Sequence, residues 1–228
     1  MQDWYTNVEN YAPIYVTSQD VIKNNREYTG GHHWADPDIL TPKLKKEIKK
    51  RFSYYGPINF VDGYPRNPVE RTYKIGRLLG KYGPNHVVDI LMKHKDKIVL
   101  IQRKDGSWAM PGGFVEYGET MHHAVLREFS EEVGAISSGE PLIDIEKSIW
   151  RVASTRKSKI IFTGYIESPN NTDWSWYECT CYYYQSKHLF DLKPGSDAID
   201  AKWVSLKDLE KYKLLPWHKT LLNQIILI

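Results

Sequence analysis

The pattern of apolar and polar positions predicts five strands. Two apolar runs, over residues 87–93 and 97–103, are joined by the charged turn HKDK and read as two strands. Two further strand-like runs, over residues 159–166 and 176–185, are separated by the turn SPNNTD, and a short strand over 202–205 follows the acidic loop PGSDAID. These strands lie before and after a helix-forming run that begins near residue 119, so the sheet draws on both parts of the chain.

The same pattern predicts four helices. Thr41 and Pro42 supply a cap and a first helical position for the basic run KLKKEIKKRF. This run is basic enough to attract phosphates, with a solvated polar face as the alternative. A second helix begins near residue 119, after a turn rich in Gly and Pro. Apolar positions 145, 149 and 152 predict an amphipathic helix over residues 142–152, and residues 214–228 read as a closing helix.

The N-terminal third of the chain differs from the rest. Residues 1 to about 67 hold short apolar pieces among Asn, Gly and Pro, and the connector from 65 to 89 carries Arg66, Arg71, Arg77 and His86 towards a site. Strands on both sides of a helix, with another helix later, fit an α/β fold in which a mixed β-sheet is sandwiched between helices. We expect an N-terminal α+β extension over residues 1–80 and the main domain over residues 81–228.

Composition argues against several classes of partner. The chain has 228 residues and a net charge of +3, which is too mild to indicate nucleic acid, and no apolar stretch is long enough to span a membrane. Cys179 and Cys181 would share one face of a strand, too far apart for an easy disulfide, so we expect reduced thiols. The first ten residues, MQDWYTNVEN, show no Arg-rich or apolar presequence. We expect a cytoplasmic monomer.

Three carboxylates are predicted to crowd one helical face. Glu128, Glu131 and Glu132 fall at i, i+3 and i+4, and Arg127 can pair with Glu131 four residues on. Like charges at this spacing repel, and clustered oxygen donors are the ligands that a hard divalent cation such as Mg²⁺ prefers. The alternative from the string EFSEE alone is a solvated acidic helix end.

The spacing of the surrounding residues distinguishes these alternatives. Gly113 is followed after five residues by Glu119 and after seven more by Arg127-Glu128, with Glu131-Glu132 and Gly134 completing the pattern. This pattern resembles the Nudix box, the signature of the Nudix hydrolase family. The resemblance implies a loop–helix–loop that binds Mg²⁺ or Mn²⁺ and hydrolyses a nucleoside diphosphate linked to another group.

Segments outside the box resemble one particular branch of the Nudix family. The stretches WADP, YPRNPVERTYKIGRLLGKYGPNHVVD, WAMPGG, NNTDWSW, KWVSL and HKTLL resemble the ADP-ribose pyrophosphatase branch of the family. They resemble equally the ADP-ribose-sensing domain of melastatin-type cation channels. The first likeness implies hydrolysis of ADP-ribose to AMP and ribose 5-phosphate, and the second implies a binding module. A Nudix hydrolase of another nucleotide derivative is the third hypothesis. The intact Arg127-Glu128 and Glu131-Glu132 pattern favours an active enzyme.

The resemblance also implies roles for individual residues. It makes Glu128 and Glu132 the main metal ligands, with Glu131 completing the set and Arg127 orienting the carboxylates. Gly112 and Gly113 would let the backbone approach the metal and the phosphates.

The general base and the substrate contacts lie partly outside the box in this family. Asp197 matches the family's residue in the loop before the last strand and Asp200 is close by, although an acidic turn without catalytic duty is the alternative. A lone His is more often structural than functional. The substrate contacts that the resemblance implies are His86, Asp89, Arg103, Gly112, Gly113, Asn171, Asp173, Asp197 and His218.

Overall fold

The computed structural model describes residues 4, 10–26, 34–133, 158–195 and 198–226. The chain forms two compact units, and strands β5 (Gly83–His94), β9 (Lys159–Tyr165) and β10 (Ser175–Gln185) contribute residues to both. The first unit comprises Met1–His86, Glu116–Gly118 and Thr163–Cys179, and the second comprises Val87–Val115, Glu119–Phe162 and Thr180–Ile228. A division at residue 80 into an extension and a main domain stays a prediction.

The first unit contains short elements. They are β1 (Ile14–Thr17), α1 (Gln19–Arg26), α2 (Pro42–Ile48), β2 (Phe60–Val61), β3 (Tyr64–Pro65) and β4 (Lys74–Arg77). Strand β1 pairs in parallel with β4, and β2 pairs antiparallel with β3. The predicted start of α2 is confirmed, because the Thr41 hydroxyl accepts a hydrogen bond from the Leu44 N–H and Pro42 lies in the first turn.

The core of the first unit encloses the carboxylate of Glu178. Its apolar part is formed by Leu44, Ile48, Ile58, Tyr82, Tyr165 and Trp176. The carboxylate of Glu178 accepts hydrogen bonds from the Ser53 hydroxyl at 2.6 Å, from the Tyr54 N–H at 2.7 Å and from the Trp176 indole N–H at 2.9 Å. These three bonds offset the loss of hydration of a buried charge, so the loop at residues 53–54 is tied firmly to β10.

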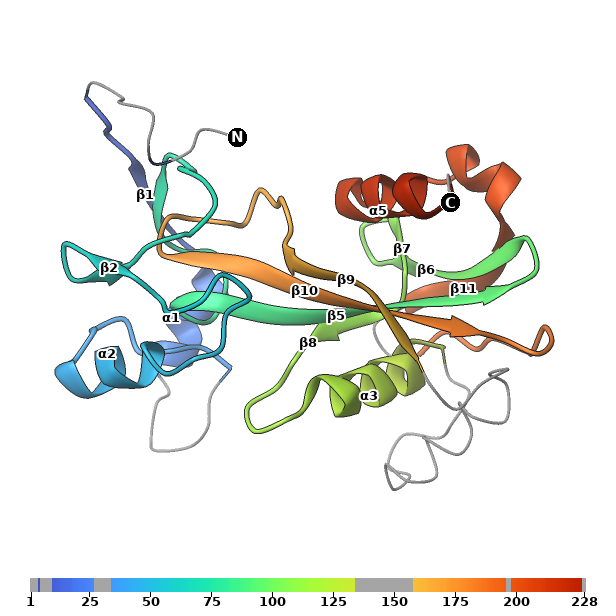
Figure 1. Ribbon diagram of the computed structural model, residues 1–228, viewed down its shortest axis with the longest axis horizontal. Helices are drawn as coiled ribbons and strands as arrows, with labels where there is room; N and C mark the ends of the chain where they lie inside the picture. The colour runs from blue at the N-terminus through green and yellow to red at the C-terminus, as the bar shows by residue number, and fades with distance from the viewer. Residues whose placement is uncertain (1–3, 5–9, 27–33, 134–157, 196–197, 227–228) are drawn as a thin grey trace. The chain divides into compact units, whose positions relative to one another are not determined.

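The second unit contains a helix on either side of its strands (Figure 1). The remaining elements are β6 (Lys97–Arg103), β7 (Trp108–Ala109), β8 (Gly112–Phe114), α3 (Met121–Val133), β11 (Ala198–Ser205), the 3-10 helix η1 (Leu206–Lys211) and α5 (Pro216–Ile226). The main sheet has the strand order β11-β6-β5-β10-β9, with β7 paired to β6 and β8 paired to β5. The predicted α/β class is confirmed.

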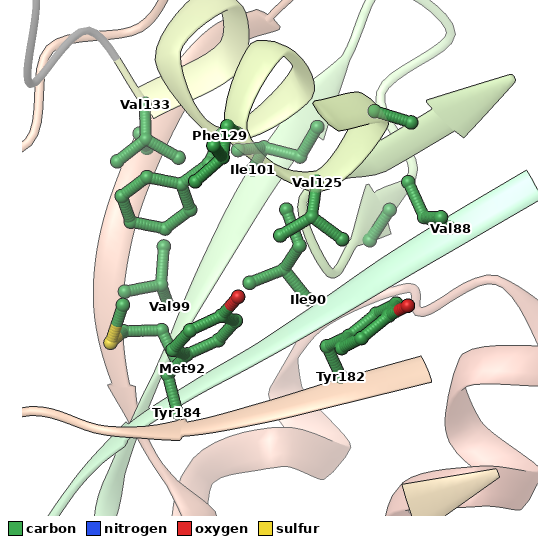
Figure 2. Close-up of a cluster of buried hydrophobic side chains, with 14 of the residues drawn as sticks. Val88, Ile90, Met92, Val99, Ile101, Val125, Phe129, Val133, Tyr182 and Tyr184 are labelled. Atoms are coloured by element: carbon green, nitrogen blue, oxygen red, sulfur yellow. The ribbon is translucent and has the colours of Figure 1, made fainter. Parts of the chain in front are cut away.

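The core of the second unit lies between α3 and the sheet. Figure 2 shows Val125 and Phe129 of α3 projecting towards Ile90 and Ile101, with Val99, Met92 and two buried tyrosines around them. Alternate residues of a strand face opposite sides of a sheet, so Asp89 lies on the face away from this core and contacts α5 instead. This alternation places one polar residue of β5 among the side chains of the C-terminal helix.

The predicted strands are confirmed with shifted ends. β6 has the predicted bounds, and β9 and β10 differ from prediction by one residue. β5 starts at Gly83, four residues earlier than predicted. The prediction missed these residues because Gly83 and Pro84 are typical of turns. In the structure Gly83 has a φ of 78° and is the first residue of the strand. β11 also starts earlier, so the expectation that the acidic loop extends to Asp200 is wrong.

Three helices complete the comparison with the sequence. The closing helix begins at Pro216 rather than at residue 214. Helix α1 was not predicted from the sequence. The helix predicted over residues 142–152 lies outside the described residues. In the part of the chain that the structure describes, no helix is long and apolar enough to cross a membrane.

Candidate active site

Helix α3 carries two buried glutamates and one exposed glutamate. Glu128 and Glu132 are 9% and 7% exposed, whereas 43% of the Glu131 side chain is exposed. The Arg127 guanidinium donates from one nitrogen to Glu128 at 2.8 Å and to Glu131 at 3.2 Å. The predicted pair between Arg127 and Glu131 is therefore confirmed. Arg127 therefore pairs with two of the three carboxylates of this helix.

Arg127 is held from its other side by Glu119. The Arg127 Nε and one terminal nitrogen donate to the two Glu119 oxygens, each at 3.0 Å, and the same terminal nitrogen donates to the Phe114 carbonyl at 2.8 Å. A bidentate pair of this kind fixes the orientation of a guanidinium plane. Arg127 is thus a fixed support against which the carboxylates of α3 are positioned.

The backbone of the glycine loop packs directly on these carboxylates. The Gly112 N–H donates to Glu132 Oε2 at 2.7 Å. A Cβ on Gly113 would lie 2.3 Å from Glu128 Oε1, and a Cβ on Gly112 would lie 2.1 Å from the Val88 carbonyl oxygen. Only glycine fits at either position without a shift of the neighbours. This explains in physical terms why two glycines precede the helix.

The charge on Glu128 is incompletely compensated. Burial raises the pKa of its carboxyl group above the ordinary value, and Glu131 and Glu119 raise it further, while Arg127 lowers it. A raised carboxyl pKa means that the ionised form is disfavoured at this position. A second cation beside the Glu128 carboxylate would lower that cost.

A histidine on α5 fixes the start of the glycine loop. His218 Nδ1 accepts a hydrogen bond from the Met110 N–H at 3.0 Å, and its Nε2 lies 3.2 Å from Asp89 Oδ1. The other Asp89 oxygen accepts a hydrogen bond from the Trp217 indole at 3.0 Å. Because Nδ1 acts as the acceptor, the hydrogen-bond pattern assigns the proton to Nε2. Asp89 and His218 thus connect β5, α5 and the loop that leads to Gly112.

The C-terminal end of α3 is held by the segment that precedes β11. The Lys193 N–H donates to the Val133 carbonyl at 3.0 Å, and the Gly195 N–H donates to the Glu132 carbonyl at 3.2 Å. These bonds satisfy carbonyls that a helix end leaves open. The predicted base Asp197 lies outside the described residues, two positions after Gly195.

Comparison with known protein families matches this arrangement of loop and helix. The NUDIX domain matches residues 84–225 of the chain, which include the glycine loop, α3 and α5. The chain belongs to the Nudix family. The predicted Nudix fold is confirmed, and the part of the predicted Nudix box that the structure describes runs from Gly113 to Val133.

Three relatives extend the match beyond the Nudix box. The mitochondrial ADP-ribose pyrophosphatase of Rattus norvegicus is 32% identical, covering 97% of this chain and 70% of that protein. The ADP-ribose pyrophosphatase of Methanocaldococcus jannaschii is 32% identical, covering 72% of this chain and 88% of that protein. Transient receptor potential cation channel subfamily M member-like 2 of Nematostella vectensis is also 32% identical, covering 89% of this chain but only 15% of that channel.

The donor set of the Nudix box fits a divalent cation by its chemistry. Glu128 and Glu132 supply buried carboxylate oxygens, the ligand type that Mg²⁺ and Mn²⁺ prefer. Among the described residues, no group of three or more His, Cys, Asp or Glu side chains is already arranged to hold a metal ion. Arg127 and the Gly112 N–H engage these oxygens instead.

The other predicted site residues fall into both units. Arg103 lies exposed at the end of β6, opposite Ala198 of β11, in the same unit as the Nudix box. His86, Asn171 and Asp173 belong to the first unit. The Asn171 side chain donates to the Ile166 carbonyl and accepts from the Tyr177 N–H, so it organises its own turn.

The environments of His86 and Asp173 are also defined within the first unit. His86 Nε2 lies 2.9 Å from the Phe52 carbonyl and its ring stacks on Phe52, while burial lowers its pKa below the ordinary value. Asp173 accepts hydrogen bonds from the Thr72 N–H at 2.9 Å, the Thr72 hydroxyl at 2.8 Å and the Tyr11 hydroxyl. Substrate contact by these residues stays a prediction.

Two residues with a structural part in the site were absent from the predicted set. Glu119 belongs to the box pattern, and its fixed spacing from Arg127 was a usable signal. Trp217 carried no such signal, because its partner Asp89 is 128 positions away in the sequence. Only the folded arrangement of α5 against β5 identifies it.

Loss of the His218 ring should destabilise this unit. We expect His218→Ala to lower the free energy of unfolding by about 2–4 kcal/mol, because the Met110 N–H and Asp89 are left buried without this partner. Urea denaturation measures the change. His188→Ala, at an exposed histidine, is the control and should stay within about 0.5 kcal/mol of the unaltered protein. Equal stability of both variants would contradict the assigned hydrogen bonds.

Proposed function

We propose that this chain is a Nudix hydrolase that cleaves ADP-ribose to AMP and ribose 5-phosphate with Mg²⁺ or Mn²⁺. The observation that carries the proposal is the match to two relatives named ADP-ribose pyrophosphatase, which extends well outside the box. The intact Arg127-Glu128 and Glu131-Glu132 pattern, with Arg127 paired to Glu128 and Glu131, supports hydrolysis rather than binding alone. Residence in the cytoplasm, a monomeric state and the lack of nucleic-acid or membrane partners stay predictions.

The residues of the Nudix box would have different roles in hydrolysis. Glu128 and Glu132, with Glu131, would hold the cation. When bound, a divalent cation neutralises charge on the diphosphate oxygens and makes water a stronger nucleophile at neutral pH. Arg127 keeps the carboxylates in position, and Gly113, which has no side chain, lets the loop pack closely against Glu128.

The general base that we propose is Asp197. Gly195, two positions before it, is anchored to the C-terminal end of α3, and Ala198 directly after it starts β11. We expect Asp197→Asn to lower kcat with little change in KM, because the carboxylate would act on the proton of the attacking water rather than in binding. Steady-state kinetics with ADP-ribose measure both constants.

Asp200 provides the matched control for this test. Its carboxylate already accepts a hydrogen bond from the Ala201 N–H and pairs with Lys202. Asp200→Asn should therefore leave kcat close to that of the unaltered protein. A normal kcat in Asp197→Asn would reject this base and direct attention to Asp200 or to a glutamate of the box.

Substrate recognition is proposed for residues outside the box. The proposed contacts are His86, Asp89, Arg103, Gly112, Gly113, Asn171, Asp173, Asp197 and His218. The N-terminal extension over residues 1–80 would contribute to this binding, since the likeness to the ADP-ribose pyrophosphatases covers it as well.

The preferred substrate is tested with a panel of nucleotides. We expect kcat/KM for ADP-ribose with Mg²⁺ to exceed that for NADH, ADP-glucose and diadenosine polyphosphates many-fold. The reason is that the matched segments outside the box would bind both ends of the ADP-ribose molecule. Chromatography of the products should give AMP and ribose 5-phosphate in equal amounts. Faster cleavage of a sugar nucleotide or a dinucleotide would assign the chain to another Nudix activity.

A binding module is the second candidate function. The match to 89% of this chain within a cation channel favours it, since that channel holds a domain of similar sequence. Tight binding of intact ADP-ribose without product formation in the presence of Mg²⁺ or Mn²⁺ would support this function and reject the hydrolase.

A further inference from the structure

An aromatic side chain near the N-terminus lies beside two arginines of the first unit. The guanidinium carbons of Arg66 and Arg71 lie 3.7 Å and 5.2 Å from the centre of the Trp4 ring. The Trp4 indole N–H donates to the Asn67 carbonyl at 2.7 Å, and Arg71 donates to the Trp4 carbonyl at 3.0 Å. Two cations are therefore held close together on one ring.

In the part of the chain that the structure describes, three nitrogen atoms of these arginines are buried with no acceptor for their N–H groups. They are the Nε of Arg66 and the Nε and Nη1 of Arg71. Buried polar groups in folded proteins nearly always have a hydrogen-bond partner, so each exception calls for an explanation such as a bound ion. Here the unpartnered nitrogens belong to two positively charged guanidinium groups. The two groups lie on the same Trp4 ring, so their like charges repel each other.

The neighbouring carboxylates direct their hydrogen bonds to neutral donors. Asp173 accepts from Thr72 and Tyr11, and Glu70 accepts from the Tyr165 hydroxyl. In the described part of the chain, none of the three buried nitrogen atoms donates to a carboxylate. Arg66 and Arg71 therefore present buried N–H donors that an anionic acceptor could satisfy.

We propose that Arg66 and Arg71 form a binding site for a phosphate group. A guanidinium offers its N–H groups in a flat fork that matches the spacing of phosphate oxygens, and one phosphate carries enough oxygens to accept from several donors at once. Both arginines remain partly exposed as residues, so the site borders solvent. The site uses no residue of the Nudix box and does not rest on the proposed function.

The site is tested by calorimetric titration of the full chain with inorganic phosphate and, separately, with AMP. EDTA is present to remove divalent cations, the ionic strength is constant, and the background is Glu132→Gln, which lacks one of the three proposed metal ligands of the box. We expect saturable binding of phosphate that is weakened about tenfold or more by Arg66→Lys and by Arg71→Lys, since lysine keeps the charge but loses the fork. AMP binding with the same losses would identify a nucleotide monophosphate as the source of the phosphate group, and binding of free phosphate alone would identify the inorganic ion.

Arg51→Lys is the matched control. Arg51 lies in the same unit, and its terminal nitrogens donate to Asp36 and to the Tyr82 carbonyl, so this substitution should leave phosphate binding intact. Circular dichroism checks that each variant is folded, and if one arginine variant fails to fold, the other carries the test. Absence of saturable phosphate binding, or equal affinity in the two arginine variants and in Arg51→Lys, overturns the proposal. Loss of ADP-ribose hydrolysis in Glu132→Gln bears only on the proposed function.

Discussion

Glu132→Gln should lower kcat for ADP-ribose by roughly 10²- to 10⁴-fold, the range typical for loss of a positioned catalytic group. The substitution preserves shape but removes the charge that would hold the cation. The amide oxygen can still accept the Gly112 N–H that now donates to Glu132 Oε2, so the glycine loop should keep its position. Steady-state rates at saturating Mg²⁺ measure the loss, and circular dichroism verifies the fold.

Two further variants test whether this loss of activity is specific to the buried glutamates of the box. Glu128→Gln should show a loss of similar size, because Glu128 is the other buried carboxylate of the box. Glu210→Gln is the control, since Glu210 forms an exposed pair with Lys219 and lies outside the box. Turnover by Glu132→Gln within a few-fold of normal, at saturating Mg²⁺, would contradict the proposal that Glu132 is a metal ligand.

Gly113→Ala should reduce activity by about 10- to 100-fold, a loss comparable to that when the supporting groups of metal ligands are disturbed. The added Cβ would lie 2.3 to 2.6 Å from three atoms of the Glu128 carboxylate group, far inside van der Waals contact. The carboxylate must therefore rotate away, and it breaks the bond to Arg127 as it does so. Activity measured over a range of Mg²⁺ concentrations should show a higher metal requirement.

Gly106→Ala separates this effect from a general loss of glycine. Gly106 has a φ of 80°, and a Cβ there would meet no atom within 4 Å. It should cost about 1 kcal/mol of stability through backbone strain while leaving kcat unchanged. If Gly113→Ala retained full activity with an unchanged metal requirement, the close packing of the loop on Glu128 would have no catalytic importance.

The local part of the site was predictable because it depends on short sequence separations. Arg127 and Glu131 pair at i, i+4, which is a property of any α-helix. The buried face of α3 follows from the same periodicity. The bounds of β6 were predicted fully because apolar residues run through it without Gly or Pro.

The remaining contacts were not predictable because they join distant segments. Glu119 is an intermediate case, because the spacing of the box marked the residue, but it precedes the first residue of α3, so its pairing with Arg127 depends on the loop geometry rather than on helical spacing. Asp89, Trp217 and His218 meet only when α5 packs beside β5. The stacking of Arg66 on Trp4 likewise joins residues that show no shared pattern in the sequence.

The bond between His218 and Met110 has a consequence for synthesis on the ribosome. Its two residues are 108 positions apart, so at 5–20 residues per second the partner of the Met110 N–H is made roughly 5–20 s after that residue. During this interval the glycine loop lacks its support from α5. Nascent chains should therefore acquire hydrolytic competence late, after the box itself has already been translated.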